Sequence, residues 1–387
     1  MPFAAAISRH PASADATAEV VGQVLDAGGA GPDLAVLFCT GDHVDAFADV
    51  VGTVQALVGP RRLLGITAGG VIGGTEEVEH PPALSLWTGT LGYVPEPVRL
   101  TAASTSAGVA LQGLPQPAGA GTGAGPGARR QTVLLLADPF SLPVPDLLDV
   151  VAAADSPVPV IGGLASAGIT PGQNRLALDG EVFAEGAVGV LLDGVDTVVS
   201  QGCRPIGSPM IVTRAEGNLL VELAGRSAVE QVEQLLGKIT AEDRALLASG
   251  GLHLGIVADE HKLAFERGDF LVRNVIGADR ERGALAVGAT PEVGTTVQFH
   301  LRDAASADED LRALLATQRD AAGALLFTCN GRGRRLFGEP DHDALLVAEH
   351  TANRAVAGMF CAGEIGPIGG RSFLHSFTAS VLLFPPA

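Results

Sequence analysis

The sequence predicts a mixed α/β (α+β) protein with two lobes, in which mixed β-sheets are flanked by helices. Its 387 residues suffice for two domains of ordinary size, each with a core of its own. Three segments have the pattern of strand, helix and strand, and the C-terminal half adds short alternating strands typical of antiparallel pairing. Together these patterns favour mixed sheets over a purely parallel one.

The three strand–helix–strand segments share one plan. Each starts with an apolar run that stops at a small or polar turn, continues through a helix-like stretch, and closes with a second apolar run that ends in glycines. They cover residues 34–74, 132–168 and 324–370. Their similarity suggests an internal duplication, although such units also resemble one another by chance. Glycines directly after a strand let a ligand approach the backbone, and α/β sheets usually bind ligands at strand ends.

The chain is expected to divide into a region of residues 1–200 and a region of residues 201–387. Within the first, residues 113–131 are almost entirely Pro, Gly and Ala, with little to bury, which is typical of a surface loop or linker.

The second region is expected to alternate strands and helices. Residues 209–223 predict a hairpin that turns at Glu216, Gly217 and Asn218. Capping patterns place helix starts at Ser227, Thr240 and Ser306. The segments 270–277, 283–288 and 295–303 are expected to form consecutive antiparallel strands.

Charge and hydropathy exclude several functional classes. The net charge is 25 − 43 = −18, and the basic residues are scattered, which argues against a nucleic-acid or anionic-membrane partner. No apolar run approaches the roughly 18 to 20 residues of a membrane span, and the N-terminus makes a poor signal peptide. A cytoplasmic location is therefore expected.

Four cysteines, at positions 39, 203, 329 and 361, include no C-x-x-C pair. Neither a zinc knuckle nor a disulfide framework is indicated, so reduced thiols are expected.

The stretch from Cys361 to Ser380 gathers a carboxylate, an arginine and a histidine among small and apolar residues. A carboxylate for an amine and an arginine for a carboxylate, with glycine N–H groups for close approach, would complement a zwitterion. The structural alternative is an ion pair between Glu364 and Arg371 that holds a glycine loop.

Further candidates lie beside glycines elsewhere in the chain. In CNGRGRR, Arg332 stands between two glycines and is the better candidate for a contact, whereas Arg334 and Arg335 are expected in solvent. In GCRPIG, from Gly202 to Gly207, either Pro205 fixes a turn or the side chains face the ligand cavity. The predicted ligand-binding residues are Cys203, Arg204, Cys329, Asn330, Arg332, Cys361, Glu364, Arg371 and His375, with the cysteines as wall residues.

Two chemical alternatives use the same residues. A thiol-dependent hydrolase or transferase would take Cys329 or Cys361 as nucleophile and His375 as base, but an activated thiol also needs a depressed pKa, which sequence does not reveal. A metal site would draw on His342, His350, His375, Glu349 or Glu364. Their spacing matches no compact ligand pattern, so no metal is expected. No other cofactor is expected either, because CNGRGRR and GGVIGG match neither a Walker A loop nor a G-x-G-x-x-G motif followed by the expected acidic residue.

The chain resembles the FIST proteins, a family named for F-box and intracellular signal transduction. The resemblance rests on LLGITAGGVIGG, GCRPIGSPMIVTRAEGNLLVELAGRSAVE, GDFLVRNVIGADRERGALAVG, VGTTVQFHLRDA, CNGRG and FCAGEIGPIGGRSFLHSFTASVLLF. These segments span nearly the whole chain and cover both the FIST N and FIST C regions. The resemblance implies a sensory role with a small ligand, such as an amino acid or a related metabolite.

The matched segments leave no room for a signalling output, which would have to come from a separate protein. The expectation is therefore a sensory protein that binds a small polar metabolite in a cleft between two lobes. An enzyme is the less favoured alternative, and an interaction scaffold without a small ligand is the third.

Overall fold

The computed structural model describes residues 2–80, 82–105, 108–113 and 130–386. Residues 114–129 of the predicted linker lie outside this range. The chain forms two compact units: the first comprises residues 1–199, 312–374 and 378–387, and the second comprises residues 200–311 and 375–377. Over the described residues, no helix combines the length and apolar character that crossing a bilayer requires.

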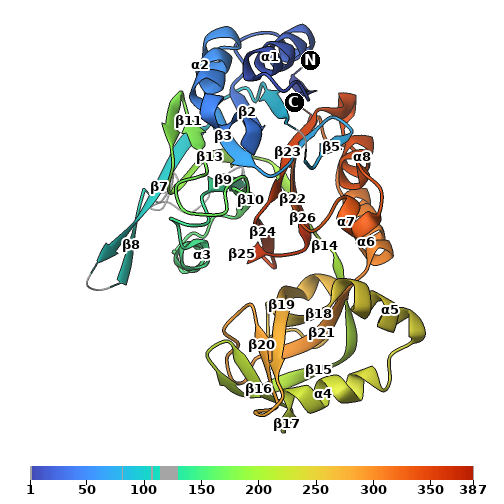
Figure 1. Ribbon diagram of the computed structural model, residues 1–387. Helices are drawn as coiled ribbons and strands as arrows, with labels where there is room; N and C mark the ends of the chain where they lie inside the picture. Colours follow the sequence, from blue (N-terminus) through green and yellow to red (C-terminus); the bar gives the residue numbers. More distant parts are fainter. Residues whose placement is uncertain (1, 81, 106–107, 114–129, 387) are drawn as a thin grey trace. The chain divides into compact units, whose positions relative to one another are not determined.

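The first unit is built on three mixed sheets (Figure 1). The first sheet has the order β1 (Phe3–Ser8), β6 (Leu84–Gly89), β2 (Leu34–Thr40), β3 (Leu63–Ala68), β11 (Leu176–Leu178), β12 (Glu181–Phe183). The second has the order β25 (Arg371–His375), β24 (Glu364–Ile368), β10 (Val160–Leu164), β9 (Gln131–Ala137), β13 (Ala187–Asp193), β7 (Glu96–Thr105), β8 (Gly108–Gln112). The third has the order β14 (Asp196–Gln201), β26 (Thr378–Phe384), β22 (Gly323–Cys329), β23 (Val356–Cys361), β4 (Val71–Gly73), β5 (Glu76–Val78).

Each predicted strand–helix–strand segment supplies the central parallel pair of one sheet. The pairs are β2 with β3, β9 with β10, and β22 with β23. The connecting helices are α2 (Phe47–Leu57), α3 (Val144–Ala152) and α8 (His342–Glu349). A strand that follows each segment, β6, β13 or β26, then pairs antiparallel with the first strand of that segment.

The short hairpin that follows each parallel pair joins a different sheet. The β4–β5 hairpin follows β3 but pairs with β23, and the β24–β25 hairpin follows β23 but pairs with β10. The β11–β12 hairpin follows β10 and pairs with β3, which closes the cycle. The expected internal duplication is therefore a threefold repeat of topology with cyclic exchange of hairpins.

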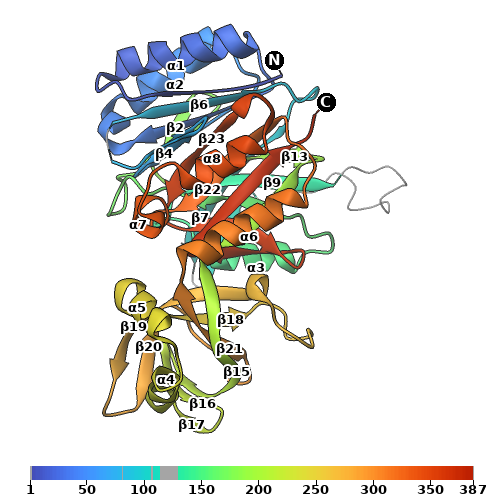
Figure 2. The same cartoon turned by 90° about the vertical axis from the view of Figure 1, so that its right-hand side faces the viewer.

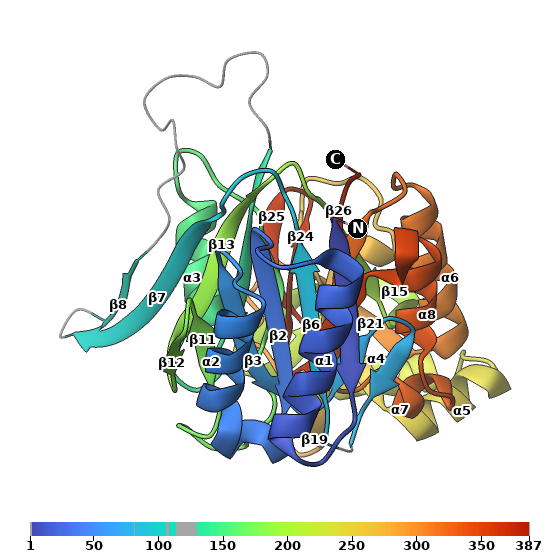
Figure 3. The same ribbon diagram turned by 90° about the horizontal axis from the view of Figure 1, so that it is seen from above.

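The three sheets share one core. Along β2, Leu34, Val36 and Phe38 contribute to a cluster that draws on all three sheets, while the alternate side chains pack under helices. Strands buried on both faces explain the continuous apolar runs of the sequence. Figure 3 shows α1 (Ser13–Gly28) and α2 along the outer face of the first sheet, and Figure 2 shows α8 beside the third.

The second unit contains six antiparallel strands whose pairings form a closed circuit. The order is β15 (Cys203–Glu216), β21 (Thr296–Arg302), β18 (Leu252–Val257), β19 (Phe270–Asp279), β20 (Ala284–Val287), β16 (Leu219–Leu223), and β16 pairs again with β15. The short β17 (Arg226–Ser227) pairs with β16, and the helices are α4 (Ala228–Leu236) and α5 (Ala241–Gly250). The described residues also form the helices α6 (Ala304–Ala316), α7 (Arg334–Phe337), η1 (Gly41–Ala46), η2 (Arg267–Asp269) and η3 (Ala352–Arg354).

Several local predictions for this unit are confirmed. The β15–β16 hairpin turns where expected, with Glu216 opposite Leu219. Ser227 caps α4, because its hydroxyl accepts from the N–H of Glu230, and Thr240 forms a capping box with Asp243.

Three local predictions are wrong. Helix α6 begins at Ala304 and not after Ser306, because Asp303 accepts hydrogen bonds from the first N–H groups of the helix. Residues 203–207 belong to strand β15 and do not form a turn at Pro205. Strand β21 pairs with β15 and β18, so it does not follow β20 in the sheet.

Candidate functional site

The three repeats of the first unit meet at the carboxyl ends of their parallel strands. After β3, the N–H of Gly69 donates to Ser166 Oγ at 2.8 Å. Ser166 follows β10, and its hydroxyl donates to the carbonyl oxygen of Phe360 in β23 at 2.5 Å. Asn330 follows β22 and donates its N–H to the Cys361 carbonyl at 3.0 Å. Gly69 and Asn330 are exposed, so this junction is accessible from solvent.

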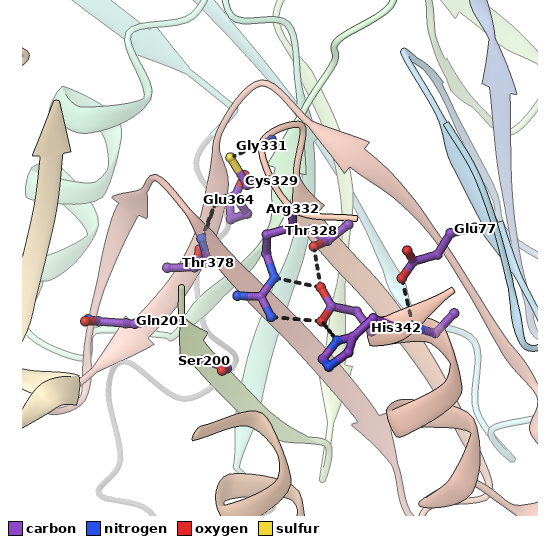
Figure 4. A network of polar contacts seen from close by, with 12 residues as sticks. Glu77, Ser200, Gln201, Thr328, Cys329, Gly331, Arg332, His342, Glu364 and Thr378 are labelled. Carbon is purple, nitrogen blue, oxygen red and sulfur yellow. Dashed lines mark hydrogen bonds and ion pairs between the residues drawn. The ribbon is translucent and has the colours of Figure 1, made fainter. Parts of the chain in front are cut away.

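Directly below the junction, Cys329 and Glu364 lie side by side (Figure 4). The Cys329 thiol is half-buried, and its sulfur accepts the N–H of Gly331 at 3.4 Å. Glu364 is fully buried, and its Oε2 accepts from the hydroxyl and the N–H of Thr378 at 2.9 and 3.2 Å. Burial raises the pKa of Glu364 from 4.5 to about 8, so the carboxyl is mostly neutral at pH 7.

Arg332 and Asp343 form a fully buried ion pair next to this carboxyl. The guanidinium donates from Nε and Nη2 to the two carboxylate oxygens at 2.6 and 2.8 Å. Asp343 also accepts the hydroxyl of Thr328 at 2.9 Å and lies 3.0 Å from His342 Nδ1. Burial alone would raise the pKa of Asp343, but Arg332 holds it well below its usual range. The pair is therefore charged.

Glu77 completes the network on the far side of Asp343. Its Oε1 accepts the N–H of Ala344, in the first turn of α8, at 3.0 Å. Burial, followed by the charge of Asp343, raises the pKa of Glu77 to about 8. Two mostly neutral carboxyls thus flank one compensated ion pair, and the cluster as a whole carries little net charge.

Four buried polar atoms of this region have no hydrogen-bond partner within the described part of the chain. They are Arg332 Nη1, Glu364 Oε1, Glu77 Oε2 and Ser380 Oγ. Figure 4 shows the free guanidinium nitrogen turned away from the carboxylate that Arg332 binds. Buried polar groups nearly always find a partner, so these atoms indicate bound water or the polar atoms of a ligand.

The threefold repeat provides an internal comparison for Glu364. The first residue of each exchanged hairpin is buried and faces the parallel strand that the hairpin joins. These residues are Val71 opposite Met359, Leu176 opposite Ile66, and Glu364 opposite Gly163. Two of the three repeats thus place an aliphatic side chain where the third places a carboxyl. The fold does not require a charge here, which favours a functional reason for Glu364.

Five of the predicted site residues come together at this junction: Cys329, Asn330, Arg332, Cys361 and Glu364. As expected, Arg334 and Arg335 are exposed. Ligand binding by these five residues remains a prediction.

Arg371 lies apart from them. It donates to Asp149 at 2.8 Å on the surface, where both residues line a depression of about 420 Å³ beside α3. The alternative of an ion pair between Glu364 and Arg371 is therefore wrong.

Cys203, Arg204 and His375 belong to the second unit. The Arg204 side chain binds two carboxylates there, donating to Asp303 at 2.6 Å and pairing with Asp243. Cys203 and His375 are buried. Their proposed ligand contacts also remain predictions.

The sequence did not reveal Asp343, Glu77, Thr378 or Ser166 as part of this site. Asp343 lies in the first turn of a helix, where an acidic residue is ordinary. Ser166 carried the only available signal, because it follows a predicted strand within the glycine-rich ending.

The structure bears on the two chemical alternatives, a thiol-dependent enzyme and a metal site. Cys361 is fully buried, and burial raises its pKa well above 9.0, which argues against Cys361 as the thiol that attacks an external substrate. Cys329, at the accessible junction, remains the candidate for thiol chemistry. Within the described ranges, no three His, Cys, Asp or Glu side chains are grouped to hold a metal ion.

Comparison with known proteins decides the family. The family model of the FIST N domain matches residues 33–226, and that of the FIST C domain matches residues 228–367. The chain belongs to the FIST family. An uncharacterized protein of Mycobacterium bovis, Mb0898c, is 41% identical over 99% of both chains. Rv0628c, an uncharacterized protein of Mycobacterium tuberculosis, is 41% identical over 99% of this chain and 100% of its own.

FIST domains are associated with sensing in signal transduction. In this FIST protein the two matched regions divide at β17, within the second unit. Both regions contribute strands to the closed circuit, and the FIST N hairpin β4–β5 pairs with the FIST C strand β23. The two regions are therefore structurally interlocked.

Proposed function

We propose that this FIST protein is a sensor that binds a small polar metabolite, an amino acid or a similar compound, at the junction of the three strand ends. The observation that carries the proposal is the pair of unpartnered buried atoms, Arg332 Nη1 and Glu364 Oε1. They offer one donor and one carboxyl oxygen below the accessible junction at Asn330.

The chemistry of the two groups suggests how a ligand would be oriented. An ammonium group would bind Glu364, which would release its proton on binding because the charged form gains a counter-ion. A carbonyl or carboxylate oxygen of the same ligand would accept from Arg332 Nη1. The bidentate bond to Asp343 fixes the guanidinium for this contact.

A sensor must also convert binding into a change that another molecule reads. Binding shifts a conformational equilibrium only if the ligand prefers one state. At the junction, Gly69 donates to Ser166 and Ser166 donates to Phe360, so two hydrogen bonds link residues of the three repeats. A ligand there would alter how these loops are held. A separate protein would read this change as the signalling output.

The test is a thermal-shift screen of amino acids, small peptides, carboxylates and amines against the purified protein. A ligand at about 100 times its dissociation constant adds about 2.7 kcal/mol to the native state. The stabilisation should be lost in Glu364→Gln and kept in Arg371→Met, which alters the surface pair with Asp149. Equal stabilisation of wild type and Glu364→Gln would place the ligand elsewhere, and no stabilisation across the screen would favour the scaffold.

A further inference from the structure

We propose that Cys329 and Cys361 form a reversible cross-strand disulfide when the protein meets a peroxide. This modification site goes beyond the proposed sensor function and does not depend on any ligand. Neither Cys329 nor Cys361 is part of a disulfide in the structure.

The two cysteines are direct neighbours across the β22–β23 ladder. They form the last registered pair of these parallel strands, so both side chains leave the sheet on the same face. Neighbouring strands lie about 4.8 Å apart. This spacing falls within the Cα separation of roughly 4.4 to 6.8 Å that a disulfide bridges. A disulfide holds its Cβ atoms about 3.5 to 4.5 Å apart, so side-chain rotation with a small approach of the two strand ends would bring the sulfurs together.

Their surroundings give the two thiols different roles. Cys329 is half-buried at the accessible junction, its sulfur accepts the Gly331 N–H at 3.4 Å, and the Arg332 cation interacts with it. Peroxides attack the thiolate of a thiol that solvent can reach, and Cys329 is the more accessible of the two. Cys361 is fully buried beside Gly163, where an added Cβ would lie 2.4 Å from its sulfur. Cys329 is thus the thiol that reacts first, and Cys361 is the resolving thiol.

The chemistry balances with hydrogen peroxide as oxidant. The Cys329 thiolate attacks one peroxide oxygen, the O–O bond breaks, and the departing hydroxide takes a proton, for which the Glu364 carboxyl is next to the thiol. Cys361 sulfur then attacks the Cys329 sulfenic acid, the S–O bond breaks, and the thiol proton leaves with the hydroxyl as water. Two thiols and one peroxide give one disulfide and two waters.

The fold does not require two thiols at this pair of strand ends. In the first repeat, the last registered pair of parallel strands is Thr40 with Ala68. Strand ends of this architecture therefore form without thiols, and alanine fits at the position that corresponds to Cys361.

The full-length protein, without ligand, is treated with equimolar hydrogen peroxide, denatured, alkylated and digested with trypsin. Trypsin separates the two thiols, because Cys329 lies between Arg319 and Arg332 and Cys361 lies between Arg354 and Arg371. We expect a cross-linked pair of these peptides, reversed by dithiothreitol, with Cys39 and Cys203 still alkylated. In Cys361→Ala, the Cys329 sulfenic acid should persist and be trapped by dimedone.

Two outcomes would overturn the proposal. The first is oxidation of Cys329 in the wild type to sulfinic acid without a cross-link. The second is equal alkylation of all four cysteines after peroxide treatment. Neither outcome bears on the thermal-shift test, because no ligand is present in this experiment.

Discussion

Glu364 pairs with Gly163 across the antiparallel ladder between β24 and β10. The glycine leaves room for the Cys361 sulfur, so the carboxyl, the thiol and the glycine come from three different strands at one point. The corresponding hairpins begin with Val71 and Leu176. Burying a carboxyl in place of such an aliphatic side chain lowers the free energy of unfolding.

That cost should appear as a pH dependence of stability. The pKa of Glu364 is 4.5 in the unfolded reference and about 8 in the native state, so between these values the folded protein binds the extra proton. The free energy of unfolding should therefore fall as pH rises from about 5 to 8. The contribution of one such group is at most about 1.4 kcal/mol per pH unit. Urea unfolding at a series of pH values measures the slope.

The Glu364→Gln variant should have a shallower slope than wild type. Glu77 shares the same direction of pKa shift and should leave part of the slope in place. The exposed Glu181→Gln serves as the matched control and should keep the wild-type profile. Identical slopes in wild type and Glu364→Gln would show that the carboxyl is ionised in the folded state.

The Arg332–Asp343 pair should be far more sensitive to a single substitution than to a double one. Asp343→Asn leaves a buried guanidinium without its counter-charge and should cost about 3 to 5 kcal/mol. Replacing both residues, as Arg332→Met with Asp343→Leu, should recover much of that loss. The free energy of unfolding in urea is the quantity to compare.

The surface pair of Arg371 and Asp149 gives the contrast. Its side chains are 51% and 68% exposed, so Asp149→Asn should cost less than about 1 kcal/mol. A loss of similar size in Asp343→Asn would mean that water reaches the inner pair.

The two FIST regions should not fold separately. A chain cut after Ser227 divides the closed strand circuit and also separates β4 from β23. We expect fragments 1–227 and 228–387 to lack cooperative unfolding and near-ultraviolet circular dichroism when produced alone. Co-expression should restore both signals, because the complementary strands are then present. A cooperative transition in fragment 228–387 alone would contradict the interlocked arrangement.

Local pattern was enough to predict the three strand–helix–strand segments that contain the parallel pairs. Apolar runs that end in glycines, with a helix between them, fix both the strands and their direction, as at Leu34–Thr40 and Leu63–Ala68. The destination of the hairpins could not be predicted. A three-residue strand such as Val71–Gly73 offers the same backbone hydrogen bonds to any open edge, so only the assembled core decides where it pairs.

The strand-end positions of the candidate site were predictable from the sequence, but the partners of its charged groups were not. Cys329, Asn330 and Glu364 stand at strand ends, where general rules expect ligands. The partners of the charged groups were not visible, because Arg371 meets an acid 222 positions away and Arg332 meets one that looks like an ordinary first-turn residue. Charge pairing depends on packing between elements, which spacing along the chain does not encode.

The hairpin exchange is cyclic, because the hairpin of each repeat pairs with a parallel strand of another repeat. One repeat by itself would have an open strand edge and a hairpin with nowhere to pair, and two further copies would satisfy both. The first unit thus corresponds to a domain-swapped cyclic trimer written into a single polypeptide. Because the three repeats belong to one chain, a residue in one repeat can differ from its counterparts in the others, as Glu364 differs from Val71 and Leu176.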